Sequence, residues 1–202
     1  MFFNLIYFMA RAIVFGDSIA NGYYGYKTLG WVSLLNQEFM EKDLFFYNRA
    51  VSGDTSNDMK KYFEIELEAI EPNLVLISIG INDSLKENGL NNVHKKDYEK
   101  NVVIFVDYLQ KKNIKVILVG IPNVDESRTL PVSWRDVYYS NKDVFEYNQI
   151  LKKISSEKQV PFIGTFGLLE NEDLKDGLHP NDNGHIKIYE KVKGFLIENK
   201  LI

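Results

Sequence analysis

The sequence predicts a three-layer α/β fold, in which helices cover both faces of a parallel sheet. Five short, nearly continuous apolar runs alternate with five longer segments whose apolar residues recur at helical spacing. Strands that are apolar on both faces are typical of parallel sheets, because helices bury both sides. Strand–helix alternation then implies right-handed crossovers within one sheet.

The five apolar runs are the predicted strands. They are Ala12–Phe15, Leu44–Asn48, Leu74–Ile79, Lys115–Val119 and Val160–Ile163. Ligands of open parallel sheets bind beyond the carboxyl ends of the strands. Polar residues that directly follow these runs are therefore the first candidates for a functional site.

Five segments carry the helical periodicity. Their apolar faces contain, in chain order, Trp31, Leu34, Leu35 and Phe39; Met59, Phe63, Leu67 and Ile70; Tyr98, Val102, Phe105, Val106 and Leu109; Val144, Tyr147, Ile150, Leu151 and Ile154; and Ile188, Val192, Phe195 and Leu196. Glu71-Pro72 marks the end of the second segment, because the residue before a proline disfavours helix. The longest irregular stretch, Pro122–Tyr138, follows the fourth strand and is predicted to be a surface loop.

Length and composition indicate one globular domain over residues 1–202, without repeats or linkers. The absence of cysteine excludes disulfides, thiolate nucleophiles and cysteine-based metal sites. The formal net charge is −4 and no long basic run occurs, which argues against nucleic acid as a partner. Three histidines, His94, His179 and His185, are the candidates for a general base or a metal ligand.

The first nine residues, Met1–Met9, are almost wholly apolar. They lack the basic region of a signal peptide and fall far short of the ~20 apolar residues of a membrane helix. We therefore expect a cytoplasmic protein without stable membrane insertion. The segment itself is either an extra packed element or an extension upstream of a start near Met9.

Four polar clusters stand where a ligand site is expected. Three follow the first three strands, and the fourth precedes the last helix. The clusters are Gly16-Asp17-Ser18-Ile19, Arg49–Thr55, Gly80–Ser84 and Asp176–Asn181. Because the carboxyl ends of parallel strands lie at one edge of the sheet, the first three clusters are expected to lie close together.

These clusters contain the parts of an acyl-transfer site. Ser18 follows a strand, where its hydroxyl would be exposed, and a serine becomes a nucleophile when a base removes its proton. His179 can be that base, and Asp176, three residues earlier, can hold its imidazole. The backbone N–H groups of Ser18 and Gly53 and the side-chain amide of Asn82 could stabilise an oxyanion.

The same clusters, in this order, resemble the sequence blocks of the SGNH hydrolases, also called GDSL-type esterases and lipases. The blocks are GDSI, NRAVSGDTS, GINDS and DGLHPN, and the resemblance extends from Ile13 to Gly184. One departure is Ile19, where the family name has leucine.

The resemblance implies a flavodoxin-like, five-stranded parallel sheet of order 2-1-3-4-5 and no metal or organic cofactor. It implies Ser18 as nucleophile, His179 as base and Asp176 as its orienting partner, with Ser18, Gly53 and Asn82 as the oxyanion hole. The implied substrate is a small or acyl ester, because family members act on lysophospholipids, thioesters, aryl esters and acetylated sugars.

Several neighbouring polar residues have plainer interpretations. Asp17 is expected to brace its loop and Asp83 to cap a helix. His94 is expected to be solvated at a helix start, and His185 to be a packing or surface residue. The aromatic side chains after the nucleophile line a pocket or pack in a loop; they are Tyr23, Tyr24 and Tyr26.

Three alternatives to an SGNH-type hydrolase remain open. An α/β-hydrolase would need G-x-S-x-G, which Ala20 breaks. A non-catalytic flavodoxin-like binding module would use the strand-end loops for a phosphate or a sugar, although no phosphate-loop motif occurs. A metal hydrolase would draw on Asp17, Asn82 and His179.

Substrate specificity is expected to depend on three segments, Tyr23–Tyr26, Lys86–Val93 and Pro122–Tyr138. Arg128 and Arg135 in the last of these could recognise a carboxylate or a phosphate, although surface solvation is the favoured interpretation. The same loop is long enough to act as a lid or to contact another subunit, so a homo-oligomer is compatible with the sequence.

Overall fold

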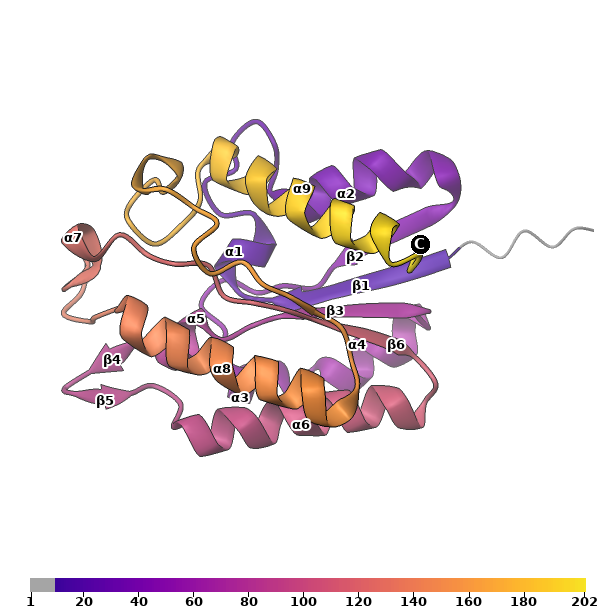
Figure 1. Ribbon diagram of the computed structural model, residues 1–202, viewed down its shortest axis with the longest axis horizontal. Helices are drawn as coiled ribbons and strands as arrows, with labels where there is room; N and C mark the ends of the chain where they lie inside the picture. Colours follow the sequence, from indigo (N-terminus) through magenta and orange to yellow (C-terminus); the bar gives the residue numbers. More distant parts are fainter. Residues whose placement is uncertain (1–9) are drawn as a thin grey trace, which may run out of the picture.

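The computed structural model describes residues 10–202 and has a five-stranded parallel sheet at its centre (Figure 1). The strand order is β2-β1-β3-β6-β7, with β4 and β5 forming a separate antiparallel hairpin. The strands are β1 (Ala10–Gly16), β2 (Leu44–Asn48), β3 (Leu74–Ser78), β4 (Lys86–Glu87), β5 (Leu90–Asn91), β6 (Lys115–Val119) and β7 (Phe162–Ile163). Counted without the hairpin, the order is the predicted 2-1-3-4-5. The interpretations of Met1–Met9 concern residues outside the described part.

Three predicted strands differ in length from the observed ones. β3 ends at Ser78, one residue earlier than predicted. β1 begins two residues earlier than predicted, and β7 is confined to Phe162–Ile163. Val160 does not extend β7, because its N–H donates to the Ser155 carbonyl at the end of the preceding helix. Pro161 has no N–H to give to a strand ladder, although its carbonyl accepts from Leu118 of β6.

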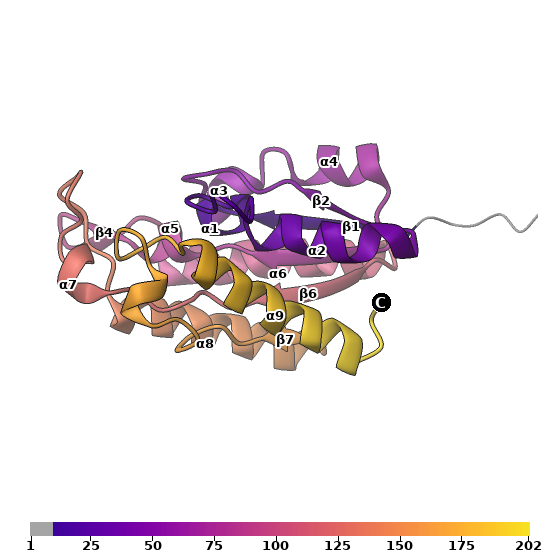
Figure 2. The ribbon, with the colours of Figure 1, turned by 90° about the horizontal axis from the view of Figure 1, so that it is seen from above.

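Helices cover both faces of the sheet (Figures 1 and 2). α2 and α9 pack together on one face, and α6 and α8 pack together on the other. The longer helices are α2 (Trp31–Phe39), α4 (Phe63–Ile70), α6 (Lys95–Lys111), α8 (Asn141–Lys158) and α9 (Asp182–Glu198). The short ones are α1 (Ser18–Asn21), α3 (Ser56–Met59), α5 (Ile81–Ser84), α7 (Glu126–Thr129), η1 (Met40–Lys42) and η2 (Asn171–Asp173). The three-layer α/β/α prediction is confirmed.

The single helical face predicted from Met59 to Ile70 is wrong, because the chain forms two helices there. α3 ends at Met59, and the turn that follows has Tyr62 donating its N–H to the Met59 carbonyl, three residues back. The Tyr62 hydroxyl donates to the Asp54 carboxylate (2.7 Å), which holds that turn against the loop before α3. The apolar spacing in the sequence continues from α3 into α4 because Met59 and Phe63 are buried in the same core although they belong to different helices.

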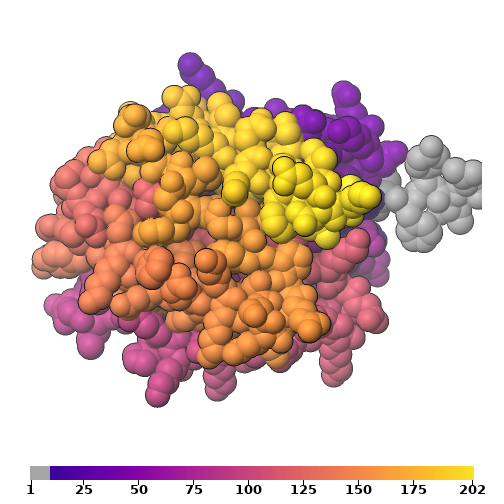
Figure 3. Space-filling view, viewed as in Figure 1, coloured from indigo at the N-terminus to yellow at the C-terminus, as the bar shows by residue number. Residues whose placement is uncertain are grey.

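The segment Pro122–Tyr138 is a surface loop only in part. It contains α7, whose N-cap Asp125 accepts from the Ser127 N–H (3.1 Å). Val124, Thr129 and Val132 are buried, so the segment is anchored to the core. α7 lies with α5 and the β4–β5 hairpin beyond the carboxyl ends of the strands, at the left of Figure 1. On the face shown in Figure 3, α8 and α9 (orange and yellow) form most of the surface.

Candidate active site

Ser18 lies where β1 turns sharply into α1. The turn requires glycine at position 16, because a Cβ there would lie 2.4 Å from the Ser78 carbonyl oxygen and 2.6 Å from the Ala20 Cβ. Asp17 is the N-cap of α1 and accepts from the Ile19 N–H (3.0 Å). Asp17 therefore braces the loop, and Ser18 is held at the carboxyl edge of the sheet.

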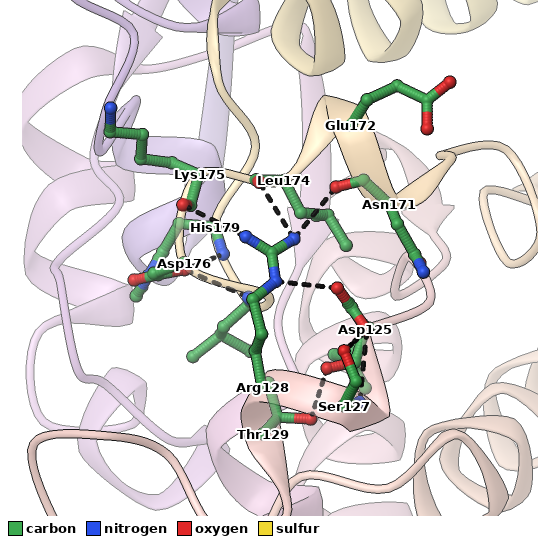
Figure 4. Close-up of polar contacts among 12 residues, drawn as sticks. Asp125, Ser127, Arg128, Thr129, Asn171, Glu172, Leu174, Lys175, Asp176 and His179 are labelled. Carbon is green, nitrogen blue, oxygen red and sulfur yellow. Dashed lines mark hydrogen bonds and ion pairs between the residues drawn. The ribbon is translucent and has the colours of Figure 1, made fainter.

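His179 and Asp176 lie on the loop before α9 and form one hydrogen-bonded chain with Ser18. The His179 Nε2 lies 3.0 Å from the Ser18 Oγ, and its Nδ1 lies 2.8 Å from the Asp176 Oδ2 (the latter pair appears in Figure 4). A ring whose Nδ1–H donates to a carboxylate leaves Nε2 as the acceptor for the serine proton. The chain can therefore transfer a proton from the serine.

The Asp176 carboxylate is tied into its own loop as well as to the histidine ring. Its Oδ1 accepts from the backbone N–H groups of Leu178 (3.0 Å) and His179 (2.8 Å). Burial raises the pKa of Asp176, but the hydrogen bonds from His179 and Leu178 outweigh burial and lower the pKa below its ordinary value. Asp176 is therefore an anion that can stabilise a protonated imidazole.

The other two predicted site residues, Gly53 and Asn82, line the same pocket of about 500 Å³ as Ser18, His179 and Asp176. The full lining is Ser18, Tyr23, Tyr24, Ser52, Gly53, Asn82, Trp134, Tyr139, Asp176, Leu178 and His179. The structure thus brings together all five residues that the sequence singled out, from four separate segments of the chain.

Three hydrogen-bond donors belong to residues that line the pocket, namely Ser18, Gly53 and Asn82. Within residues 10–202, the backbone N–H groups of Ser18 and Gly53 have no hydrogen-bond acceptor. Gly53 has a φ of 88°, and a Cβ there would meet nothing within 4 Å, so its backbone borders open space. The Asn82 amide donates one N–H to the Asp54 carbonyl (2.9 Å), which leaves its second N–H for a ligand. These three groups could bind one oxyanion.

Tyr139 is a pocket residue that the sequence reasoning missed. Its hydroxyl donates to the Asn82 Oδ1 (3.2 Å), and burial raises the pKa of Tyr139 to about 12, so it is a neutral donor. This contact determines which end of the Asn82 amide faces the pocket. Tyr139 belongs to no recognisable motif. The one feature of the sequence that could have identified it as a pocket residue is its position directly after the predicted loop Pro122–Tyr138.

Aromatic rings surround the exposed side of His179. The ring centroids of Tyr23, Tyr24 and Trp134 lie 4.8, 5.8 and 6.3 Å from the imidazole. Tyr26 is 71% exposed and does not line the pocket. The expectation of an aromatic pocket after the nucleophile therefore applies to two of the three tyrosines.

Asp83 differs from its predicted role as the cap of a following helix. It lies inside α5, and its carboxylate accepts from the Ser56 N–H (3.0 Å) and hydroxyl at the start of α3. Burial raises the pKa of Asp83 to about 6 and that of Asp17 to about 7. Asp83 directly follows Asn82, whose side chain is a candidate donor, and Ser56 lies three residues after Gly53, whose backbone N–H is another. The hydrogen bonds between Ser56 and Asp83 therefore join the two segments that carry these donors.

The other two histidines lie outside the hydrogen-bonded chain. His94 is the N-cap of α6, where its Nδ1 accepts from the Lys96 N–H (3.3 Å). His185 is fully buried in α9, and its Nε2 donates to the Tyr23 carbonyl (3.0 Å). His185 is therefore a packing residue, as expected, and it supports the backbone of a pocket residue.

The structure does not place Arg128 and Arg135, the two candidates for binding a substrate anion, in the pocket. Arg128 donates to Asp125 and to backbone carbonyls, and Arg135 pairs with Glu87 (2.9 Å) on the surface. Both guanidinium groups already have acceptors within the protein.

Two features are absent from the part of the chain that the structure describes. Among residues 10–202, no cluster of three or more histidine, aspartate or glutamate side chains is arranged to hold a metal ion. None of the helices in this range is both long and apolar enough to cross a membrane.

A parallel sheet of this order, with a serine–histidine–aspartate chain at its carboxyl edge, defines the SGNH class of hydrolases. The chain belongs to the GDSL-like lipase/acylhydrolase family, whose model matches residues 14–186. It is therefore a hydrolase of the esterase kind, and this family acts on small-molecule esters.

Several proteins with known names are similar in sequence to this chain, and they differ in how much of their own length the similarity covers. The thioesterase 1/protease 1/lysophospholipase L1 of Escherichia coli is 27% identical over 191 residues, covering 90% of this chain and 82% of the relative. A multidomain esterase of Ruminococcus flavefaciens is 30% identical over 141 residues, covering 64% of this chain; the match spans 17% of that much longer protein. The crystal structure of TesA superimposes with a TM-score of 0.73 at 22% identity, covering 92% of this chain and 97% of TesA.

Proposed function

We propose that this protein hydrolyses carboxylic esters through an acyl-enzyme on Ser18, with His179 as general base and acid and Asp176 as its orienting anion. The single observation that carries the proposal is the unbroken chain from the Ser18 Oγ to the His179 Nε2 (3.0 Å) and from the Nδ1 to the Asp176 Oδ2 (2.8 Å). A nucleophile within hydrogen-bond reach of a base, which a third group orients, is the arrangement that activates serine.

Acylation begins when the Ser18 Oγ attacks the ester carbonyl carbon and its proton passes to the His179 Nε2. The carbonyl π electrons move to oxygen and form a tetrahedral oxyanion. When the oxyanion collapses, the C–O bond to the alcohol breaks, and the imidazolium gives its proton to the leaving oxygen. Asp176 stabilises the imidazolium that exists between these two steps.

Deacylation repeats the proton transfers with water as the nucleophile. The His179 Nε2 removes a proton from water as the water oxygen attacks the acyl carbon, and a second oxyanion forms. Its collapse breaks the bond to the Ser18 Oγ, which takes back the proton from the imidazolium. The carboxylic acid leaves, and the starting state of the chain is restored.

The oxyanion of both steps would be bound by the N–H groups of Ser18 and Gly53 and by the Asn82 amide. The two backbone groups have no acceptor within residues 10–202, and Gly53 borders open space, which supports this assignment. Donors held in place before the reaction stabilise developing charge without the cost of reorienting them.

The lining of the pocket favours a short acyl group. Leu178 is its one aliphatic side chain, and the other apolar surface comes from tyrosine and tryptophan rings. A long alkyl chain is held by a length of aliphatic surface, whereas aromatic rings suit an aryl group or the apolar face of a sugar. We therefore propose short-chain acyl esters whose alcohol portion packs on Tyr23, Tyr24 and Trp134.

A fluorophosphonate probe and an ester panel test this proposal. The wild-type protein should become covalently labelled and should hydrolyse p-nitrophenyl acetate faster than the octanoate, while Ser18→Ala should do neither. Wild-type protein that is not labelled and not active would overturn the ester hydrolase and favour a binding module. A preference for octanoate would overturn the short acyl group alone.

Tyr139→Phe should lower kcat by about 10-fold with little change in KM, which corresponds to about 1.4 kcal/mol of transition-state stabilisation. The substitution removes only the hydroxyl that orients the Asn82 amide. Tyr138→Phe is the matched control, because the Tyr138 hydroxyl binds Asp136 (2.9 Å) and the residue does not line the pocket. Steady-state kinetics that are equal in both variants would contradict a role for the Tyr139 hydroxyl.

A further inference from the structure

The Arg128 guanidinium lies next to the loop that carries Asp176 and His179, between this loop and Asp125 (Figure 4). Its Nη2 donates to the carbonyls of Asn171 (2.9 Å) and Leu174 (3.1 Å), and its Nη1 donates to that of Lys175 (3.3 Å). One side chain therefore holds three of the five carbonyls that precede Asp176 in the sequence.

The same loop is closed on itself and touches α7 at a second point. Lys175 donates its N–H to the His179 carbonyl (2.8 Å), so Asp176 and His179 belong to one tight turn. The N–H of Asp125 donates to the Gly177 carbonyl (2.8 Å), at the tip of that turn. A Cβ on Gly177 would lie 2.7 Å from the Arg128 Cβ, so the backbone of the turn lies directly against Arg128.

Arg128 is itself held in one orientation. Its Nε donates to the Asp125 Oδ2 (2.7 Å), and the Asp125 side chain is 8% exposed, against 38% for Arg128. Asp125 also accepts from the Ser127 N–H and hydroxyl, so it is fixed from the other side. A planar guanidinium can satisfy a carboxylate and three carbonyls at once, whereas the compact lysine ammonium cannot span them.

Neither the guanidinium nor the Asp125 carboxylate lines the pocket, so Arg128 can act on the reaction only through the turn. Ser18 is attached to β1, whereas His179 is attached to this turn, 161 residues away in sequence. The distance between the Ser18 Oγ and the His179 Nε2 therefore depends on what holds the turn in place.

We propose that Arg128, fixed by Asp125, is a positioning residue that places the Asp176–His179 turn at hydrogen-bond distance from Ser18. The proposal depends on the serine hydrolase mechanism proposed above. A displacement of about 1 Å between a base and its nucleophile can cost about 10²-fold in rate. A turn that loses three hydrogen bonds next to Asp176 should move by a distance of this order.

The test compares Arg128→Lys with Arg135→Lys, each of which retains one positive charge in the same segment. Arg135 pairs with Glu87 on the surface and has no contact with the turn, so it is the matched control. Arg128→Lys should lower kcat by about 10- to 100-fold and leave KM unchanged. Its rate of labelling by the fluorophosphonate should fall by a similar factor, and Arg135→Lys should behave as wild type.

Circular dichroism at the assay temperature separates positioning from simple loss of folded protein. The proposal is overturned if Arg128→Lys retains the kcat of Arg135→Lys, or if kcat falls only in proportion to the folded fraction. Should Arg128→Lys not fold, Asp125→Asn provides the second variant. The asparagine oxygen would continue to accept from the two Ser127 donors, so its NH₂ group would face the Arg128 Nε, which would lose its acceptor. Wild-type kcat in a folded Asp125→Asn would equally overturn the proposal. Wild-type protein that is neither labelled nor active would overturn the serine mechanism instead, so the two failures are distinguishable.

Discussion

Asp176→Asn should lower kcat by about 10⁴-fold, while the protein remains folded. The substituted asparagine would keep an oxygen for the N–H groups of Leu178 and His179, which the Asp176 Oδ1 accepts in the native protein. Its amide NH₂ would then face the His179 Nδ1, where a carboxylate oxygen now lies at 2.8 Å. The geometry of the turn is retained and only the hydrogen-bonding character of one atom changes.

The large effect follows from the tautomer of the imidazole. An amide donor at Nδ1 makes that nitrogen an acceptor, which moves the ring proton to Nε2. An Nε2–H cannot remove the Ser18 proton, and no anion remains to stabilise an imidazolium. KM should change little, because the asparagine side chain fills the same volume at the pocket wall as the aspartate that it replaces.

The measurement is kcat of Asp176→Asn, and the control is kcat of Asp136→Asn. Asp136 is an exposed aspartate whose carboxylate binds the Tyr138 hydroxyl, and it does not line the pocket. The two variants lose the same charge, so a general electrostatic effect would appear in both. A kcat for Asp176→Asn within a factor of about ten of wild type would be incompatible with the roughly 10⁴-fold effect expected of an orienting aspartate.

Asn82→Ala should lower kcat by about 10²–10³-fold, the cost of one lost oxyanion donor. The Asn82 amide donates one N–H to the Asp54 carbonyl and is turned by the Tyr139 hydroxyl so that the other N–H is free for the oxyanion. Asn82→Asp should cost more than Asn82→Ala, because it places a carboxylate of the same shape beside a developing negative charge.

The measurement for Asn82 is kcat in each variant, with Asn91→Ala as control. Asn91 also donates its amide to a backbone carbonyl, that of Ser84 (2.8 Å), but it lies outside the pocket. Loss of that hydrogen bond should affect stability and not kcat. An Asn82→Asp variant as active as Asn82→Ala would contradict the placement of Asn82 at the oxyanion.

Much of the fold could be predicted because strands and long helices leave local patterns. β2 and β6 have the predicted bounds, since short apolar runs contrast sharply with the polar residues around them. The break between α3 and α4 could not be predicted, because apolar spacing continues through it, and the turn depends on a contact between Tyr62 and Asp54. Likewise, α7 is too short to show a period of its own.

The sequence by itself determined the fold class, the four polar blocks and the Asp176–His179 pair, because each depends on residues close together along the chain. Three residues of separation place a carboxylate beside an imidazole within one turn. Only the tertiary structure decided that Tyr139 turns the Asn82 amide, and that Arg128 supports the turn instead of binding a substrate. These contacts join segments far apart in sequence, and their partners are backbone carbonyls and single hydroxyls that leave no pattern to read.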